Sequence, residues 1–405
     1  MVPETQLTRP PAFAASEYAQ WQESVRQRAA ERGFDALLIA DPSNLYYLTG
    51  YDAWSFYTPQ VLHLPVEGAP TLIMRAMDAH GAWRTATGIT ASDIFGYPEM
   101  LIHNATEHSG DWMGALLGKR GHGGRQRVGY EGEAHFFTIR TYLAFAAAQP
   151  QWSLEDCGDL VNWVRLIKSP AEIEIMRGAG RVCTEVMRTA VAAMWPGRPQ
   201  NEVAAEILAA QARGTVGTDG DYPAIVPLLP TGPGADTPHL TWTEEPTPVG
   251  APISLELAGV HRRYHAPMAR TVVIGHAPED LKRLAAATVE GVNEALAVVR
   301  PGVLARDVSA AFTRVIAAAG YEKTSRLGYS IGIGYPPDWG ERTISIRSEE
   351  EAVLEENMTF HMIAGMWLAD SGFELSEAIR VSDTGVELLT HAPRELITLE
   401  ERRFR

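Results

Sequence analysis

Glu256 is a carboxylate in the middle of an apolar strand. In the segment 252–259, strand alternation places Ser254, Glu256 and Ala258 on one face and three aliphatic side chains on the other. The small neighbours leave the carboxylate room to act on a ligand. A structural ion pair would explain Glu256 equally well, and three arginines are close enough in the sequence to form it: Arg262, Arg263 and Arg270.

A second carboxylate, Glu377, stands where a hydrophobic residue belongs. The segment 372–381 precedes a Ser-Asp-Thr-Gly turn, which is typical of one arm of a β-hairpin. Alternation groups Glu377 with three aliphatic residues, Leu375, Ile379 and Val381. A buried carboxylate is costly unless it is paired, its pKa tends to rise, and such groups cluster at functional sites. The alternative is an ion pair with Arg380 or another arginine.

His239 is the candidate base. It lies in a loop, residues 237–242, that leads to a strand. A neutral imidazole is a natural general base near pH 7. The chain has 12 histidines, so an ordinary surface or capping role stays open.

Aromatic residues are dense in two regions, residues 46–57 and residues 329–367. Aromatic walls suit a flat, delocalised cation through cation–π contacts. We expect most of these rings in the core. Trp54 and Phe56 are exceptions, because they lie in a polar loop.

The elements that position these residues form two predicted domains. The first alternates helix and strand, with a helix capped by Ser16 and strands at 36–40, 61–64 and 71–74. This order is typical of an α/β domain. We place the domains at residues 1–163 and 164–405.

The second domain begins with a strong helix signal. Ser169 caps the helix, Pro170 takes its first position, and Glu172 completes a capping box. A weak repeat follows, because Pro196 and Pro301 both precede a glycine between two helices. The spacing predicts a duplicated helix–helix–strands unit.

The composition excludes several classes of protein. The net charge of −15 over 405 residues argues against nucleic-acid and anionic-membrane binders. The two cysteines, Cys157 and Cys183, stand outside any CxxC pair, which predicts a reducing, cytoplasmic compartment. We expect neither a signal peptide nor a membrane span. No phosphate-binding glycine loop or HExxH motif occurs.

The sequence resembles the creatinase/prolidase/methionine-aminopeptidase superfamily over essentially its whole length. The segment 37–51 is similar to the N-terminal domain of creatinases and prolidases, and the segment 165–173 to the start of their catalytic domain. Residues 256–271 and Glu377 resemble the strands that carry the metal ligands. The resemblance implies an α/β creatinase-like N-terminal domain and an α+β catalytic domain of the pita-bread fold, with an internal pseudo-twofold duplication.

The metallopeptidases of this superfamily hold two metal ions with two Asp, one His and two Glu. At those positions this chain has, in order, Glu256, Pro267, Tyr329, Ile363 and Glu377. Three of the five cannot hold a hard divalent ion. The resemblance therefore points to the metal-free branch, of which creatinase is a member, with no cofactor. His361 shares the strand parity of Ile363, and its role stays open.

Within that branch, four longer stretches are similar to ectoine hydrolases: 49–57, 219–231, 238–242 and 335–343. The resemblance implies hydrolytic opening of ectoine, and of hydroxyectoine, to N-acetyl-2,4-diaminobutyrate in a homodimer. It implies Glu256 as nucleophile or electrostatic stabiliser, His239 as general base and Glu377 as proton shuttle.

The same resemblance suggests where the substrate binds. Trp54 and Phe56 would cover the ring from the N-terminal domain of a second subunit. Three further aromatic residues would line the rest of the site: Trp242, Tyr329 and Trp339. Arg342 would bind the substrate carboxylate.

Two other interpretations stay open. The protein could be a creatinase or another amidine hydrolase, or an Xaa-Pro peptidase. It could also be a pita-bread domain without catalysis that serves as a binding module, as in a eukaryotic histone chaperone. The acidic balance would suit a basic partner, but His239 and both glutamates argue for catalysis.

Overall fold

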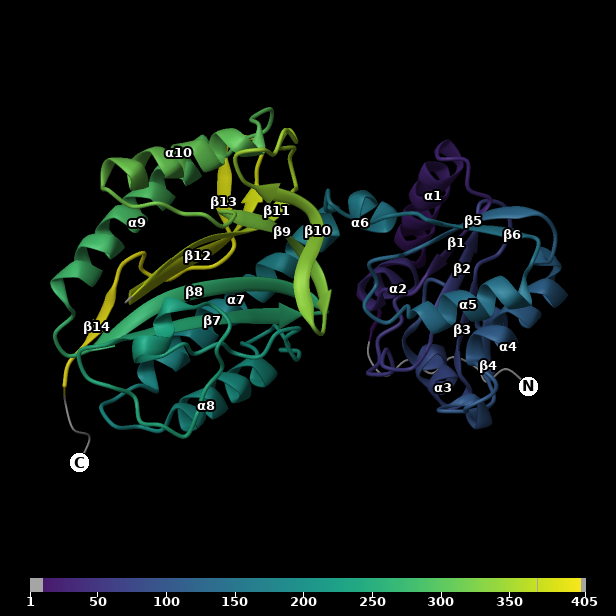
Figure 1. The fold of residues 1–405 in the computed structure, drawn as a ribbon, viewed down its shortest axis with the longest axis horizontal. Helices are drawn as coiled ribbons and strands as arrows, with labels where there is room; N and C mark the ends of the chain where they lie inside the picture. The colour runs from purple at the N-terminus through teal and green to yellow at the C-terminus, as the bar shows by residue number, and fades with distance from the viewer. Residues whose placement is uncertain (1–9, 370, 402–405) are drawn as a thin grey trace. The chain divides into compact units, whose positions relative to one another are not determined.

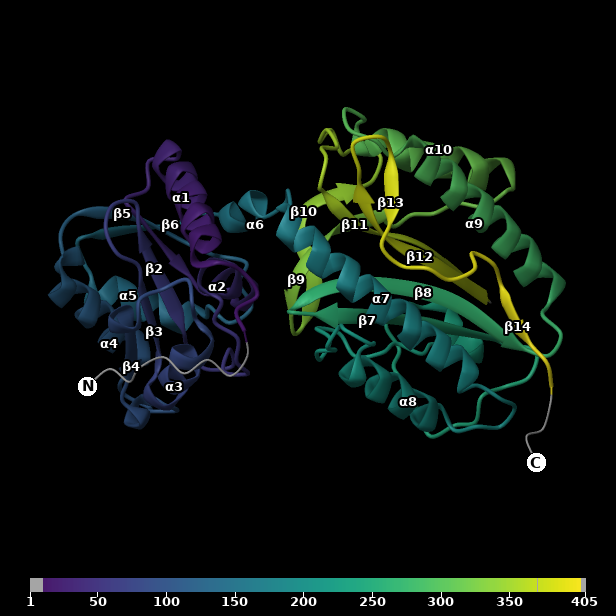
Figure 2. The same ribbon diagram turned by 180° about the vertical axis from the view of Figure 1, so that it is seen from behind.

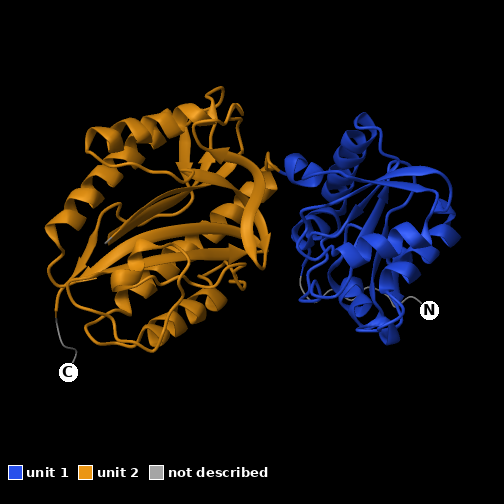
Figure 3. Ribbon diagram, in the orientation of Figure 1, with its two compact units in different colours: residues 1–165 blue, residues 166–405 orange. Residues whose placement is uncertain are grey.

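The computed structural model describes residues 10–369 and 371–401. The chain divides into two compact units, residues 1–165 and 166–405 (Figure 3). The division predicted from the sequence, between 163 and 164, lies close by. The signal-peptide prediction rests partly on residues 1–9, which lie outside the described residues. Within the described residues, no helix has the length and apolar character needed to cross a bilayer.

The first unit is an α/β domain on a six-stranded mixed sheet with the order β4-β3-β2-β1-β5-β6. The three central strands pair antiparallel, and the outer ones join in parallel. The strands are β1 (Ala36–Ile39), β2 (Val61–Pro65), β3 (Thr71–Arg75), β4 (Ile94–Tyr97), β5 (Gln126–Tyr130) and β6 (Trp152–Asp156). The helices are α1 (Ala15–Glu31), α2 (Pro42–Thr49), α3 (Ala76–Thr85), α4 (Ser109–Leu117), α5 (Ile139–Ala148) and α6 (Leu160–Val164).

Helix α1 follows its apolar spacing. It buries four side chains spaced three or four residues apart, Tyr18, Trp21, Val25 and Ala29. The indole of Trp21 stacks on the ring of Tyr47 in α2, with 4.4 Å between ring centroids. The predicted cap is wrong, because the helix begins at Ala15 and Ala14 is its N-cap, without a side-chain hydrogen bond. Ser16 is therefore already inside the helix.

The second unit has the predicted pita-bread architecture, a curved sheet flanked by two helix pairs (Figures 1 and 2). The sheet order is β13-β12-β11-β9-β8-β14, with β10 on β9 and β7 on β8. The helices are α7 (Pro170–Ala192), α8 (Gln200–Arg213), α9 (Glu279–Val298) and α10 (Ala305–Ala318). The strands are β7 (Pro252–His261), β8 (Tyr264–Ile274), β9 (Gly328–Tyr335), β10 (Asp338–Ile346), β11 (Thr359–Leu368), β12 (Ser371–Val381), β13 (Val386–Leu388) and β14 (Ile397–Leu399).

The predicted duplication is present. Each half consists of two helices followed by antiparallel strands, and the two helix pairs are joined at Gly197 and Gly302. Both glycines have positive φ, 80° and 85°, a conformation that glycine adopts without steric cost. Each helix pair covers its own apolar cluster, one formed with β7 and β8, the other with β11 and β12.

The start of α7 matches the predicted capping box. Ser169 Oγ accepts a hydrogen bond from the Glu172 backbone N–H at 3.3 Å, and Glu172 Oε2 accepts one from the Ser169 N–H at 2.7 Å. Glu172 is buried, and the hydroxyl of Tyr264 in β8 donates to its Oε1 at 2.8 Å. The box therefore also ties α7 to the strand hairpin that carries Glu256.

A buried ion pair anchors the start of the second unit to β10. Lys168 Nζ lies 2.6 Å from Glu341 Oε2, and both side chains are 1% exposed. Lys168 Nζ also donates to the Leu166 carbonyl at 3.1 Å. Removing one member of such a pair leaves an uncompensated charge in the interior.

We predict that Lys168→Met lowers the free energy of unfolding by about 3–5 kcal/mol, because Glu341 is then buried without its partner. The double variant Lys168→Met/Glu341→Leu removes both charges and should recover most of this loss. Urea denaturation followed by circular dichroism measures the difference. The prediction fails if the single variant is as stable as the wild type, or if the double variant is no more stable than the single one.

Candidate active site

Backbone pairing brings β7, β8 and β12 together at Glu256. Glu256 in β7 lies opposite Ala269 in β8. The Ala269 N–H donates to Ser376 Oγ in β12 at 2.6 Å. Thr271 Oγ1 donates to the Glu374 carbonyl at 3.0 Å and accepts from the Glu374 N–H at 2.8 Å. Because side chains alternate along strands, Glu374 and Ser376 share the sheet face on which Glu256 lies.

The carboxyl groups of Glu256 and Glu374 interact in a buried environment. Glu256 is 5% exposed and Glu374 is 0% exposed. Burial raises the pKa of Glu256 to about 7. Burial, and then repulsion by Glu256, raise the pKa of Glu374 well above its ordinary range. At neutral pH, Glu374 therefore holds a proton while Glu256 is able to ionise. When the pKa values of two neighbouring carboxyl groups differ in this way, one group can act as an acid and the other as a nucleophile or base.

Next to this pair, a chain of hydrogen-bonded side chains extends across four strands, β12, β11, β9 and β10. The Trp339 indole N–H donates to the Tyr329 hydroxyl at 2.9 Å, and the same hydroxyl lies 2.9 Å from His361 Nδ1. His361 Nε2 lies 2.6 Å from Ser376 Oγ. Burial, and then the charge of Glu256, raise the pKa of Tyr329 well above its ordinary range, so the phenol stays protonated beside the carboxylate.

His361 is neutral in this arrangement. It is 0% exposed, and burial lowers its pKa to about 3. Both ring nitrogens have hydrogen-bond partners, Tyr329 and Ser376. His361 therefore holds the phenol and the serine in place.

The structure brings together three of the predicted residues, Glu256, Tyr329 and Trp339. It does not bring Glu377 to them. The Glu377 carboxylate accepts from Arg270 Nη2 at 2.7 Å and from Thr390 Oγ1 at 3.1 Å, on the opposite face of β12. The predicted strand and hairpin are correct, but the contacts of Glu377 support the structural alternative, an arginine ion pair.

Glu374 and Ser376 were not predicted from the sequence, and the role of His361 was left open. A signal for Glu374 was present. It shares its face with Ser376 and Ala378, small residues like those beside Glu256. The aliphatic neighbours of Glu377 mark the face that packs on a core, because Leu375 and Ile379 belong to the apolar cluster under α9 and α10.

His239 lies on an exposed loop that backbone hydrogen bonds connect to the strand of Glu256. The loop follows a short 3-10 helix, η4 (Gly232–Asp236), that contacts β7, β11 and β12. The Leu229 N–H donates to the carbonyl of Leu240, the residue after His239, at 3.0 Å. Leu228 pairs with Glu256 itself, since its N–H donates to the Glu256 carbonyl at 2.9 Å.

The other predicted binding residues have different surroundings. Trp242 is partly buried and lines a cavity of about 480 Å³ together with Gln200 and Leu229. Arg342 is half-buried in β10, with a positive φ of 52°.

In the first unit, Trp54 is 56% exposed, whereas Phe56 is 3% exposed and lies 5.1 Å from the Phe136 ring. The expectation that Phe56 is free of the core is therefore wrong. Its ring fills the interior of the first unit, and the polar residues around it did not reveal this.

The donors present do not suit two divalent cations. Of the positions that the resemblance assigns to metal ligands, Pro267 and Ile363 have no donor side chain, and Glu377 is bound by Arg270. Across residues 10–369 and 371–401, no three His, Cys, Asp or Glu side chains form a group that could hold a metal ion. The nearby imidazole of His361 has both nitrogens engaged.

The carboxyl pair predicts how stability depends on pH. Glu256 holds its proton in the folded chain up to a pKa of about 7, against an ordinary value of 4.5 when unfolded. Its stabilising contribution is complete below that ordinary value and is lost as the pH rises through about 7. Glu256→Gln cannot titrate, so its free energy of unfolding relative to wild type should rise by on the order of 1–3 kcal/mol between about pH 5 and about pH 8.

Urea denaturation at a series of pH values measures this difference. Glu244→Gln, at an exposed position, is the matched control and should keep a constant offset from the wild type. Parallel curves for Glu256→Gln and the wild type would contradict the prediction.

Comparison with known proteins agrees with this architecture. Residues 22–167 match the creatinase/prolidase N-terminal domain, and residues 174–386 match the metallopeptidase family M24. The chain is 41% identical to an ectoine hydrolase of Halomonas elongata, over 95% of this chain and 98% of that protein. It is 39% identical to an uncharacterised hydrolase/peptidase of Sinorhizobium fredii, over 95% of this chain and 98% of that protein.

Solved structures show the same fold. A prolidase from Thermococcus sibiricus has a TM-score of 0.81 at 21% identity, covering 94% of this chain and 99% of that chain. The sequence matches extend over both units, and the fold agrees with them. The chain is thus a hydrolase that belongs to the metallopeptidase family M24 and carries a creatinase/prolidase N-terminal domain.

Proposed function

We propose that the protein opens the ring of ectoine, and of hydroxyectoine, by hydrolysis to N-acetyl-2,4-diaminobutyrate. The observation that carries the proposal is the buried pair of Glu256 and Glu374, with Tyr329 and Trp339 beside it. The 41% identity to an ectoine hydrolase over nearly the whole of both chains supports the choice of substrate.

The charge of the site suits an amidinium ring. Ectoine carries a planar cation whose electrophilic carbon lies between two nitrogens. An ionised Glu256 supplies one buried negative charge opposite this cation, and burial strengthens the attraction. The phenol of Tyr329 and the indole of Trp339 add aromatic surface next to it.

In the proposed reaction, Glu256 faces the electrophilic carbon as the nucleophile or as the carboxylate that stabilises attack by water. His239 takes the proton from water. Glu374, protonated at rest, gives its proton to the leaving ring nitrogen as the C–N bond breaks. This role was assigned to Glu377 from the sequence; the interaction of Glu374 with Glu256 and its raised pKa support Glu374 instead.

The proposal includes metal independence, because the donors around Glu256 do not suit divalent cations. It also includes a homodimer in which the exposed indole of Trp54, from a second subunit's N-terminal domain, covers the substrate ring. We place the reaction in the cytoplasm, in keeping with the two buried free thiols, Cys157 and Cys183.

The direct test is turnover of ectoine by the purified protein after dialysis against a chelator. We expect NMR to show loss of the ring and appearance of N-acetyl-2,4-diaminobutyrate, with no dependence on added metal. Creatine and Xaa-Pro dipeptides are the comparison substrates and should remain unchanged. Peptide cleavage that requires two tightly held divalent ions per chain would overturn the proposal.

A matched pair of variants on β12 tests the proton donor. Glu374→Gln should lower kcat by ~10²–10⁴-fold, the range for loss of a general acid or base. Glu377→Gln changes the same residue type on the other face, so it should leave the kcat of folded enzyme within about threefold while lowering the free energy of unfolding by about 3–5 kcal/mol, because Arg270 loses its buried partner.

Stopped assays on folded protein, with stability measured in parallel, separate the two effects. If Glu377→Gln lowers kcat as strongly as Glu374→Gln does, proton transfer belongs to Glu377 after all.

A further inference from the structure

Arg326 lies at the edge of the candidate site. It precedes β9, and its guanidinium carbon is 4.3 Å from the ring centroid of Tyr329. Its Nη1 donates to Ser345 Oγ in β10 at 3.1 Å, and the residue is exposed. The hydroxyl of Tyr329 reaches His361 and lies in the field of Glu256. Only one side chain therefore separates the Arg326 cation from the reacting carboxylate.

Arg326 has no carboxylate partner in the part of the chain that the structure describes. Across residues 10–369 and 371–401, neither Arg326 nor its neighbour Arg347 forms an ion pair, although the chain has a net charge of −15. The guanidinium fork of Arg326 is thus available to an anionic ligand group.

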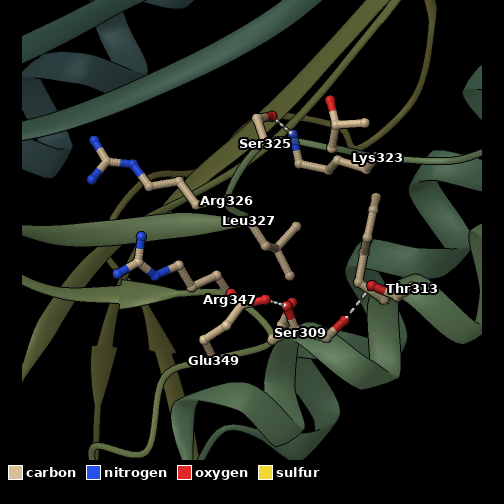
Figure 4. A pocket seen from close by; sticks show the side chains of 11 residues that line it. Ser309, Thr313, Lys323, Ser325, Arg326, Leu327, Arg347 and Glu349 are labelled. Carbon is tan, nitrogen blue, oxygen red and sulfur yellow. Dashed lines mark hydrogen bonds between the residues drawn. The ribbon is translucent and has the colours of Figure 1, made fainter.

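Arg326 and Arg347 also line a neighbouring cavity. A cavity of about 410 Å³ lies between α10 and the segment 323–327 (Figure 4). Figure 4 shows Arg326 and Arg347 extended side by side, with their guanidinium groups directed away from Ser309 and Thr313 of α10. Lys323 is already engaged, because its Nζ donates to Ser325 Oγ and to the Gly365 carbonyl, both at 2.8 Å.

The site therefore has two poles, a buried carboxylate pair and an exposed guanidinium, separated by the Tyr329 ring. A small zwitterion with a planar cation at one end and a carboxylate at the other has the two charges that these poles attract. We propose that Arg326 binds the carboxylate of the substrate, an inference that rests on the proposed function. It replaces Arg342, the half-buried residue of β10 that the sequence suggested.

The test pairs each variant with two ligands, ectoine and 2-methyl-1,4,5,6-tetrahydropyrimidine, which has the same ring without the carboxylate. Arg326→Ala should raise the KM for ectoine by ~10- to 100-fold, the value of a lost charge-assisted hydrogen bond, with a smaller change in kcat. The KM or inhibition constant of the ligand without a carboxylate should change less than about twofold. Arg326→Lys, which keeps the charge but not the fork, should lie between.

Arg347→Ala is the matched control. It removes the same charge from a neighbouring position without a contact to Tyr329, and we expect it to change the KM for ectoine by less than about threefold. Thermal unfolding of each variant checks that the fold is kept.

The inference is overturned if Arg326→Ala weakens both ligands equally, if it leaves the KM for ectoine unchanged, or if Arg342→Ala alone produces the ectoine-specific loss. A wild-type enzyme that converts ectoine while Arg326→Ala behaves normally refutes only this assignment. A wild-type enzyme without activity on ectoine refutes the proposed function together with it.

Discussion

Glu256 and Glu374 are buried side by side, and two carboxylates in that position repel each other too strongly to be ionised together. One of them must hold a proton at neutral pH, and burial assigns it to Glu374. The site thereby carries a single negative charge and an acid within reach of it. A protein that buries such a pair holds an ionisable carboxylate and a proton donor next to each other.

The duplicated fold makes this pair possible. Glu256 comes from the first half of the second unit and Glu374 from the other half. Strand β8 joins the two halves, because its Ala269 and Thr271 form hydrogen bonds with β12. On the opposite face, the ion pair of Arg270 and Glu377 binds the same two strands together. One strand pair is therefore held rigidly from both sides, which keeps the carboxyl groups close despite their repulsion.

Much of the fold could be predicted from local patterns. The capping box at Ser169, the buried stripe of α1 and the repeat marked by Gly197 and Gly302 depend on residues near one another in the chain. Glu256 could also be found, because a lone carboxylate between small residues is conspicuous in an apolar strand. Phe56 could not, since a ring in a polar loop becomes buried only when residues such as Phe136 fold over it.

The sequence by itself puts Glu374 and Glu377 on opposite faces of β12, because side chains alternate along a strand. It could not determine which of the two glutamates faces Glu256. In β12 nearly every residue is buried, because the helices cover one face and the rest of the curved sheet encloses the other. Alternation of polar and apolar residues distinguishes inside from outside only when one face meets water. Here the pairing of β12 with β8 made the choice, directing Glu374 to Glu256 and Glu377 to Arg270.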